Sequence, residues 1–419
     1  MEQQSSLSYC RVLDLSDEKG FLCGKILGDL GADVIKVEKP GGDHSRNIGP
    51  FYHDIPDPEK SLHWFAYNTS KRGITLDIET ADGQQVFKQL IKTADFFIET
   101  FHPGFMDYLG LSYSELEKIN PGLIMVSITP FGQSGPFKNY KAPDIVAMSM
   151  SGLPLVTGEA DRPPLRIGIP QSYPQAGTQG AMAAVIAYYH RERTGEGQHV
   201  DVSMQEAVLW GATPMQQFSK ISPPLWAIMK NVAFRGSRML RGGVWVRGTW
   251  PCKDGWVSWR MMVGPGLGLR IRYLVDWLDN EGMAGDMKDI DWEYGVDVLK
   301  TGQSDIDHWE KLWGDFFITK TMVELYEGSI ERGITLYPVN NFADVLANTQ
   351  LKYREFFVPL EHSELNTTIT YPGAPYNSTE TPYKLRSRAP LIGEHNQEVY
   401  EELGFSTEKI TLLKECGII

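Results

Sequence analysis

Short apolar runs alternate with amphipathic segments along the first 200 residues. The runs at 11–15, 31–38, 74–77, 95–99 and 123–129 are rich in valine, isoleucine, leucine and phenylalanine, as strands buried on both faces are. The segments at 24–30, 80–93 and 112–119 have a helical spacing of apolar residues. This alternation predicts a mostly parallel sheet with helices on both faces. In such sheets ligands bind beyond the carboxyl ends of the strands.

An alanine-rich segment follows at residues 177–193. Its small apolar side chains predict a helix that packs closely against the core or a second subunit, and Thr194-Gly-Glu-Gly197 marks its end. Residues 198–203 then alternate as a strand does. The stretch 170–197 therefore places a loop and the start of a buried helix together, an arrangement that can present a reactive side chain.

The character of the chain changes beyond Leu209. Prolines at 223–224, glycines near 241–243 and a group of tryptophans indicate a linker into a second domain with a small antiparallel sheet, in which Lys253-Asp-Gly255 is the turn of a hairpin. Helices are expected at 307–316 and 321–332. We expect residues 334–339 to return the chain to the first domain and residues 389–404 to form a docked helix. The predicted division is a large domain of residues 1–210 and 335–419, a linker at 211–224 and a small domain at 225–334.

Composition restricts the class of protein. With 42% hydrophobic and 22% charged residues, the chain is expected to be a globular protein of the cytoplasm, without a membrane segment or secretory signal. A net charge of −13 argues against nucleic acid as a partner. Its 4 cysteines are scattered, so we expect reduced thiols and no disulfide framework.

Candidate ligand-binding residues come from charge and position. No GxGxxG or P-loop motif follows a predicted strand, so neither a dinucleotide nor an NTPase site has specific support. Histidines are isolated, and no metal site is expected. The cationic residues near predicted strand ends are the candidates for phosphate binding, although each is also explained as a solvated surface charge: Lys36, Lys39, Arg46, Lys71, Arg72, Lys138 and Lys141.

Several motifs, in order along nearly the whole chain, resemble the family III CoA-transferases, a group that includes formyl-CoA:oxalate, carnitine and arylsuccinate CoA-transferases and the α-methylacyl-CoA racemases. The matching stretches are 30–40 (LGADVIKVEKP), 101–104 (FHPG) with 109–111 (LGL), 120–121 (NP), 131–136 (FGQSGP), 193–198 (RTGEGQ) leading to 201–204 (DVSM), 253–255 (KDG) and 389–396 (APLIGEHN).

The resemblance implies an α/β fold with a Rossmann-like large domain formed by both chain ends, a smaller inserted α+β domain, and two interlocked subunits. CoA or acyl-CoA would be a substrate, with no permanently bound cofactor and no metal. By matching position, Lys39 and Lys141 resemble contacts to CoA phosphates, and Lys71 and Phe101 resemble neighbours of the adenosine. Gly264, Gly266 and Gly268 are similar to the glycine loop that closes over the active site.

Transferases of this family use an aspartate nucleophile, which attacks the acyl thioester and gives a mixed anhydride and CoA thiolate. That aspartate stands four residues before a glycine that opens the alanine-rich helix. Here the glycine is Gly177, and Tyr173 stands in the nucleophile position. A phenol is mostly protonated at neutral pH and is a poor substitute.

The racemases instead use a histidine and aspartate pair. The second acid of the family matches Asp144, but Pro143 occupies the histidine position, so the pair is incomplete and racemase activity is not expected. Asp144 is also explained as a helix cap or as a hydrogen-bond partner of the loop before the alanine-rich helix. Tyr173 is also explained as a packed aromatic side chain.

Three hypotheses follow. The first is that the chain is a subunit of a CoA-transferase that moves CoA between a succinyl-CoA-like donor and an arylsuccinate-like acid, beside a homologous subunit that carries the aspartate. The second is an active homomeric acyl-CoA enzyme that uses Asp144 or Tyr173. The third is a non-catalytic acyl-CoA-binding or scaffold protein.

Overall fold

The computed structural model describes residues 5–158, 162–211, 238–239, 244–262, 266–297 and 300–419. The chain forms two compact units, each described by itself below. The first comprises Met1–Ser151, Gly168–Ala212 and Thr349–Ile419, and the second comprises Gly152–Ile167 and Thr213–Asn348. The first unit is therefore built from both ends of the chain.

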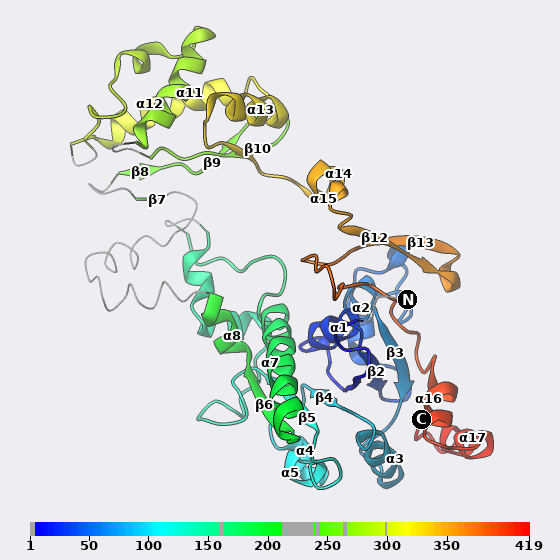
Figure 1. Cartoon of the computed structure of the whole chain (residues 1–419). Helices are drawn as coiled ribbons and strands as arrows, with labels where there is room; N and C mark the ends of the chain where they lie inside the picture. The colour runs from blue at the N-terminus through cyan, green and yellow to red at the C-terminus, as the bar shows by residue number, and fades with distance from the viewer. Residues whose placement is uncertain (1–4, 159–161, 212–237, 240–243, 263–265, 298–299) are drawn as a thin grey trace. The chain divides into compact units, whose positions relative to one another are not determined.

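The first unit contains a six-stranded, all-parallel sheet in the order β3-β2-β1-β4-β5-β6, which confirms the predicted sheet (Figure 1). The strands are β1 (Arg11–Asp14), β2 (Asp33–Glu38), β3 (Lys71–Thr75), β4 (Phe96–Glu99), β5 (Ile124–Thr129) and β6 (Gln198–Ser203). This is the doubly wound order of dinucleotide-binding folds, in which the direction of winding reverses between β1 and β4. A ligand is expected beyond that point.

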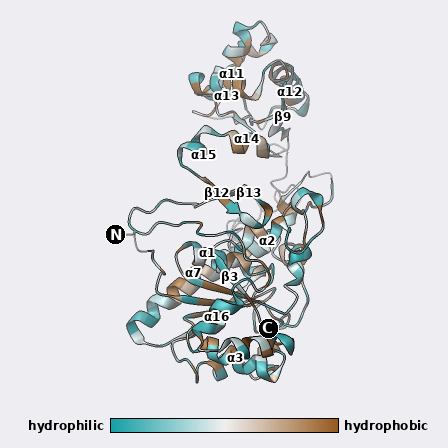
Figure 2. Cartoon of the chain, turned by 90° about the vertical axis from the view of Figure 1, so that its right-hand side faces the viewer, coloured by the Kyte–Doolittle hydropathy of each residue, from teal (hydrophilic) through white to brown (hydrophobic). Residues whose placement is uncertain are grey.

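Neighbouring residues of each strand face opposite layers of helices. Val12 and Phe96 pack in one core with α1 and α7, whereas Leu13 and Phe97 pack in another with α3, α5 and the C-terminal helices. The helices of this unit are α1 (Phe21–Asp29), α2 (Leu62–Tyr67), α3 (Ala81–Ile91), α4 (Phe105–Tyr108), α5 (Tyr113–Leu116), α6 (Asp144–Met150), α7 (Ser172–Thr194), α8 (Met204–Gly211), α15 (Thr349–Tyr353), α16 (Asn396–Glu402) and α17 (Thr407–Glu415). Figure 2 shows the result, with hydrophobic strands inside and the hydrophilic helix α16 at the surface.

Helix α16 docks against β3, as predicted for residues 389–404. Its entry loop completes the edge of β3, because the Gly73 N–H donates to His395 Nδ1 and the Thr75 N–H donates to Asn396 Oδ1, at 3.0 and 2.8 Å. Tyr400 is fully buried, and its hydroxyl donates to the Thr75 carbonyl at 2.6 Å. A hairpin of β12 (Phe357–His362) and β13 (Thr367–Pro372) precedes it.

The second unit has a three-stranded antiparallel sheet in the order β11-β10-β9 under a tryptophan-rich helical core. Its elements are β7 (Arg238–Met239), β8 (Trp245–Val246), β9 (Thr249–Pro251), β10 (Trp256–Ser258), β11 (Tyr337–Pro338), α11 (Gly268–Asn280), α12 (Gln303–Phe317), α13 (Met322–Arg332) and α14 (Phe342–Ala347). The predicted hairpin at 253–255 joins β9 to β10 and is confirmed. The predicted linker at 211–224 lies, apart from Gly211, outside the described residues.

Two boundaries differ from the prediction. Residues 334–339 do not return the chain to the first unit, because Tyr337 and Pro338 pair with β10, and the first unit resumes at Thr349. The alanine-rich helix begins at Ser172 instead of Gly177, so that Tyr173 lies in its first turn and not in a loop. Pro174 is compatible with this early start, because the first turn needs no N–H donor there. Within the described part of the chain, every helix is too short or too polar to span a bilayer.

Candidate functional site

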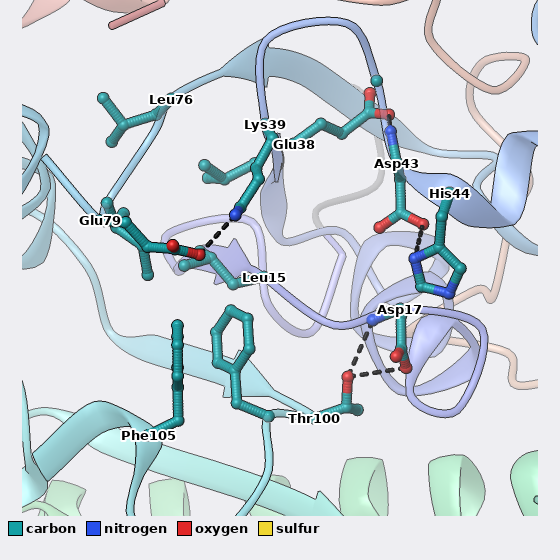
Figure 3. Close-up of a pocket in the computed structure, with 14 residues that line it drawn as sticks. Leu15, Asp17, Glu38, Lys39, Asp43, His44, Leu76, Glu79, Thr100 and Phe105 are labelled. Atoms are coloured by element: carbon teal, nitrogen blue, oxygen red, sulfur yellow. Dashed lines mark hydrogen bonds and ion pairs between the residues drawn. The ribbon is translucent and has the colours of Figure 1, made fainter. Parts of the chain in front are cut away.

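A cavity of about 420 Å³ opens beyond the carboxyl ends of β1, β2, β3 and β4. We call it the switch-point cavity, because it lies where the winding of the sheet reverses (Figure 3). Residues at the ends of these four strands, or after them, line it: Leu15, Asp17, Val37, Glu38, Lys39, Gly42, Asp43, His44, Leu76, Ile78, Glu79, Thr100, Phe101 and Phe105. Its walls combine apolar side chains with charged groups at the rim, as a site for a long, partly polar ligand requires.

Two of the predicted CoA contacts meet in this cavity. Lys39 stands directly after β2, is largely exposed, and pairs with Glu79 across the opening (Figure 3). Phe101 follows β4 and packs on Phe105, with ring centroids 4.7 Å apart. An exposed cation beside a pair of aromatic rings is suited to a nucleotide, because the amine meets phosphate and the rings meet the base.

The other predicted CoA contacts lie elsewhere. Lys71 is buried, and its Nζ donates to Asp14 Oδ2 at 2.7 Å, to Asn68 Oδ1 at 2.9 Å and to the Phe21 carbonyl at 3.0 Å. Lys141 is exposed in the segment before α6. Neither residue lines the switch-point cavity.

The glycine loop belongs to the second unit. Gly264 lies outside the described residues, and Gly266 has φ = +77°, a conformation that favours glycine. Gly268 begins α11 against the backbone of Trp292, where a Cβ would lie 1.9 Å from the carbonyl oxygen. Gly268 is therefore needed for packing within its own unit.

Three further residues predicted as phosphate-binding candidates form hydrogen bonds or ion pairs within the protein. Lys36 is buried and donates to the carbonyls of Asp14 and Ser16. Arg46 is buried in an ion pair with Glu38, and Arg72 pairs with Asp33, Glu398 and Glu402. Of the seven cationic candidates, Lys39, Lys138 and Lys141 are the exposed ones.

Asp144 caps the alanine-rich helix from a different element. It is the first residue of α6 and is only 4% exposed. Its Oδ1 accepts from the Gln171 N–H, the Ser172 N–H and the Ser172 hydroxyl, each at 2.8 Å. These contacts satisfy donors that the first turn of a helix leaves open, which explains why α7 begins five residues earlier than its sequence predicts.

Tyr173 is held by the same junction. Its hydroxyl oxygen accepts from the Asp144 N–H at 3.0 Å, and its ring packs against the core under α7. Burial raises the pKa of the Tyr173 phenol to about 12. At neutral pH about one phenol in 10⁵ is ionised at that pKa, so the side chain offers almost no nucleophilic oxyanion.

One group of side chains, of which Asp17 and His44 line the cavity, has metal-ligand geometry. Asp17, Glu18 and His44 place one ligand atom each within 4.8 Å of one another. They also have partners within the protein, since Asp17 pairs with Lys19 and Glu18 accepts from the Ser45 hydroxyl. These internal contacts account for the arrangement of the two carboxylates.

Sequence reasoning missed a buried polar chain at the end of β4. Glu99 is 2% exposed, its Oε2 accepts from the Phe101 N–H at 2.6 Å, and it also hydrogen-bonds to the Ser127 hydroxyl. Ser127 Oγ and His199 Nε2 are 2.8 Å apart. These three residues line a second cavity of about 430 Å³, which we call the edge cavity. The available signal was a carboxylate at the last position of an otherwise apolar strand.

Comparison with known proteins identifies a family model, relatives and a solved structure that match this chain. The model of CoA-transferase family III matches residues 7–396. The chain is 33% identical to a succinyl-CoA:(R)-benzylsuccinate CoA-transferase subunit, BbsE, of Thauera aromatica, over 98% of this chain and 97% of that protein. It is 30% identical to a formyl-CoA:oxalate CoA-transferase of Streptomyces coelicolor, over 99% of both chains. A crystal structure of a CAIB/BAIF family protein from Brucella suis superposes with a TM-score of 0.78 at 28% identity, covering 96% of this chain and all of that one.

Proposed function

The chain belongs to CoA-transferase family III, and we propose that it acts there as the subunit without the nucleophile, beside a homologous chain that carries the aspartate. The observation that carries the proposal is the state of position 173. A protonated, half-buried phenol accepts a hydrogen bond where the family pattern has a carboxylate. The second acid of the family pattern is present, because Asp144 matches it and fixes the start of α7.

The proposed substrates are a succinyl-CoA-like donor and an aryl-substituted succinate as acceptor. A protein 33% identical along nearly the whole chain is named as a subunit that works on succinyl-CoA and (R)-benzylsuccinate. Other relatives at 28 to 29% identity are named for transfer between succinyl-CoA and small dicarboxylic acids. The switch-point cavity, with Lys39 and Phe101, is our candidate for the nucleotide end of CoA.

In the proposed complex, the partner subunit carries out the covalent step. Its aspartate oxygen attacks the thioester carbonyl, the C–S bond breaks, and CoA leaves as the thiolate. This chain contributes CoA binding and the interface, in line with the interlocked arrangement that the family resemblance implies. Asp144 is not proposed as a substitute nucleophile, because its carboxylate is buried and caps α7.

A mixing experiment tests the proposal. The chain is purified alone and also co-expressed with a homologue that has aspartate at the position matching Tyr173. Transfer from succinyl-CoA to benzylsuccinate is followed by separation of the CoA thioesters. We expect turnover only in the mixture, and acyl-group trapping with hydroxylamine only on the partner's aspartate. Turnover by this chain alone, or a label on Tyr173 or Asp144, would contradict the proposal.

A further inference from the structure

The segment after β4 separates the two cavities of the sheet edge. Thr100, Phe101 and Phe105 line the switch-point cavity, while Glu99, His102 and Met106 of the same stretch line the edge cavity. Glu99 reaches both sides, since it lines the edge cavity and holds the backbone of Phe101 at 2.6 Å. A change at Glu99 therefore acts directly on the wall of the candidate CoA site.

We propose that Glu99 is a positioning residue that fixes this wall through the Phe101 amide and takes up a proton when CoA binds, so that the affinity for CoA falls as the pH rises. The inference rests on the proposed function, because it takes the switch-point cavity as the CoA site. Glu99 is not among the residues that line the switch-point cavity, and it acts through the Phe101 amide.

The hydrogen-bond chain at Glu99 can accommodate both charge states. When Glu99 is ionised, the Ser127 hydroxyl donates to it and His199 Nε2–H donates to Ser127. When Glu99 is protonated, its O–H donates to Ser127 Oγ, and Ser127 donates to an unprotonated His199 Nε2. Burial lowers the pKa of His199, which favours the neutral ring that both directions need. In either state the Phe101 N–H keeps an acceptor.

The charges around Glu99 set the direction of the coupling. Burial, together with the nearby carboxylates of Asp17 and Asp201, raises the pKa of Glu99 to about 7. Asp17 lines the switch-point cavity, so a charge inside that cavity is felt at Glu99. The phosphates of CoA bring more negative charge to the same space and favour protonated Glu99. The titratable and charged groups around Glu99 and the edge cavity are Asp17 after β1, Asp201 and His199 on β6, His102 on its own loop, Asp107 on α4, Tyr113 on α5 and Lys138.

CoA binding and protonation of Glu99 are expected to favour each other. If the pKa of Glu99 is near 7 in the free chain and higher in the complex, binding takes up a proton between these two values. Affinity is then constant below pH 6, falls as the pH passes 7, and levels off above the pKa of the complex. Each unit by which the ligand raises that pKa weakens binding about tenfold at high pH.

The test measures binding of dephospho-CoA to the full chain by calorimetry from pH 6 to 8.5. Dephospho-CoA is chosen because the second pKa of a phosphate monoester, about 6, would otherwise titrate in the same range. The variant Glu99→Gln keeps an oxygen for the Phe101 N–H and an amide donor for Ser127, and so imitates the protonated acid at every pH. Glu361→Gln, at an exposed position of β12 outside both cavities, is the matched control.

We expect wild-type affinity to fall about three- to tenfold across this range, and Glu99→Gln to bind at every pH as the wild type does at pH 6. Glu99→Asp retains a titrating carboxylate and is expected to bind more weakly but to keep the pH dependence. Ser127→Ala removes a bond that lowers the pKa of Glu99 and should move the transition to higher pH. Proton uptake, read from buffers of different ionisation heat, tests the wild type even if a variant does not fold.

The outcomes separate the two proposals. Equal pH profiles in wild type and Glu99→Gln, or no proton uptake by the wild type, would overturn the role of Glu99 and leave the CoA site intact. Absence of binding by every variant at every pH would overturn the CoA site itself, and the inference with it. Groups common to all variants, including His44, cancel in the comparison.

Discussion

At the residue scale, Tyr173 and Asp144 share the start of α7 but differ in what they do there. Asp144 holds the helix through three hydrogen bonds from Gln171 and Ser172, and Tyr173 only accepts the N–H of Asp144. The three hydrogen bonds of the cap do not include the side chain at position 173, which contacts the backbone of Asp144 instead. This separation makes the two positions testable one at a time.

Tyr173→Asp should give the chain a transferase activity of its own. A carboxylate in the first turn of α7 lies at the positive end of the helix dipole, which favours its ionised form. We expect succinyl-CoA-dependent turnover above the wild-type background, at a stability cost of about 1–2 kcal/mol for the lost aromatic packing. Thioester exchange and urea unfolding are the measurements.

Tyr173→Phe is the control, because it keeps the ring and removes only the acceptor of the Asp144 N–H. It should show no turnover and lose about 1–2 kcal/mol. If Tyr173→Asp folds and stays inactive, the remaining site of this chain is not competent for the first half-reaction.

Asp144→Ala should destabilise the first unit. The substitution leaves two N–H groups and a buried hydroxyl without their acceptor, and we expect a loss of about 2–3 kcal/mol in the free energy of unfolding. Asp144→Asn retains an oxygen in the same place and should lose about 1 kcal/mol. Urea denaturation followed by circular dichroism measures both. Equal stability of the alanine variant and the wild type would mean that the cap does not stabilise α7.

At the scale of elements, the crossing of α1 and α7 depends on small residues. A Cβ at Gly177 would lie 3.0 Å from Leu22 Cβ and 3.1 Å from the Cys23 backbone nitrogen, and Gly180 meets Cys23 and Ile128 in a similar way. Ala176, Ala181, Ala184 and Ala187 of α7 are buried on the same side. The predicted close packing of this helix is confirmed.

Gly177→Ala should therefore destabilise the chain, although the same change in an exposed helix stabilises by about 1 kcal/mol. We expect a loss of about 1–2 kcal/mol, because the neighbouring Leu22 Cβ and Cys23 nitrogen can move only together with the backbone of α1. Thr178→Ala, one residue further on the exposed side of α7, should change stability by less than about 0.5 kcal/mol. A stabilised Gly177→Ala variant would show that the two helices have room to separate.

The sequence predicts that a helix or strand is present better than it predicts where that element begins and what it pairs with. Strand runs such as 123–129 and the hairpin turn at 253–255 are local patterns, and both agree with the structure. The start of α7 and the partner of β11 depend on contacts between distant residues, with Asp144 and with β10. No local pattern contains that information, so both boundaries were wrong.

The candidate site divides in the same way. Lys39 and Phe101 follow strands and could be placed from the sheet alone, whereas the burial of Lys71 against Asp14 becomes visible only in three dimensions. Glu99 was missed because its role comes from Ser127 and His199, which lie on other strands. Patterns locate strand ends, but they do not show which charges face one another.

At the scale of the whole molecule, the tryptophans report mainly on one unit. Of the 11 tryptophans, only Trp64 and Trp210 belong to the first unit, and the core of the second contains Trp250, Trp292 and Trp313. Fluorescence therefore follows the second unit, while circular dichroism follows both.

Lys71→Met should separate the two signals. Removing the ammonium leaves Asp14 buried without its partner, and we expect the first unit to lose about 3–5 kcal/mol. The midpoint of the dichroism change in urea should fall, and that of the fluorescence should stay near the wild-type value. Coincident shifts would mean that the chain unfolds as one cooperative body. Exposed Lys118→Met, on the surface pair with Glu115, is the control and should change neither midpoint.

The cap that Asp144 places on α7 also bears on how position 173 can change by mutation of the gene. Tyrosine and aspartate codons differ only in their first base, so one T-to-G change exchanges the two at position 173. Because the helix start is fixed by Asp144, that change leaves the backbone support of the position in place. If the proposed function is right, a supporting subunit and a catalytic one are separated, at this position, by a single point mutation.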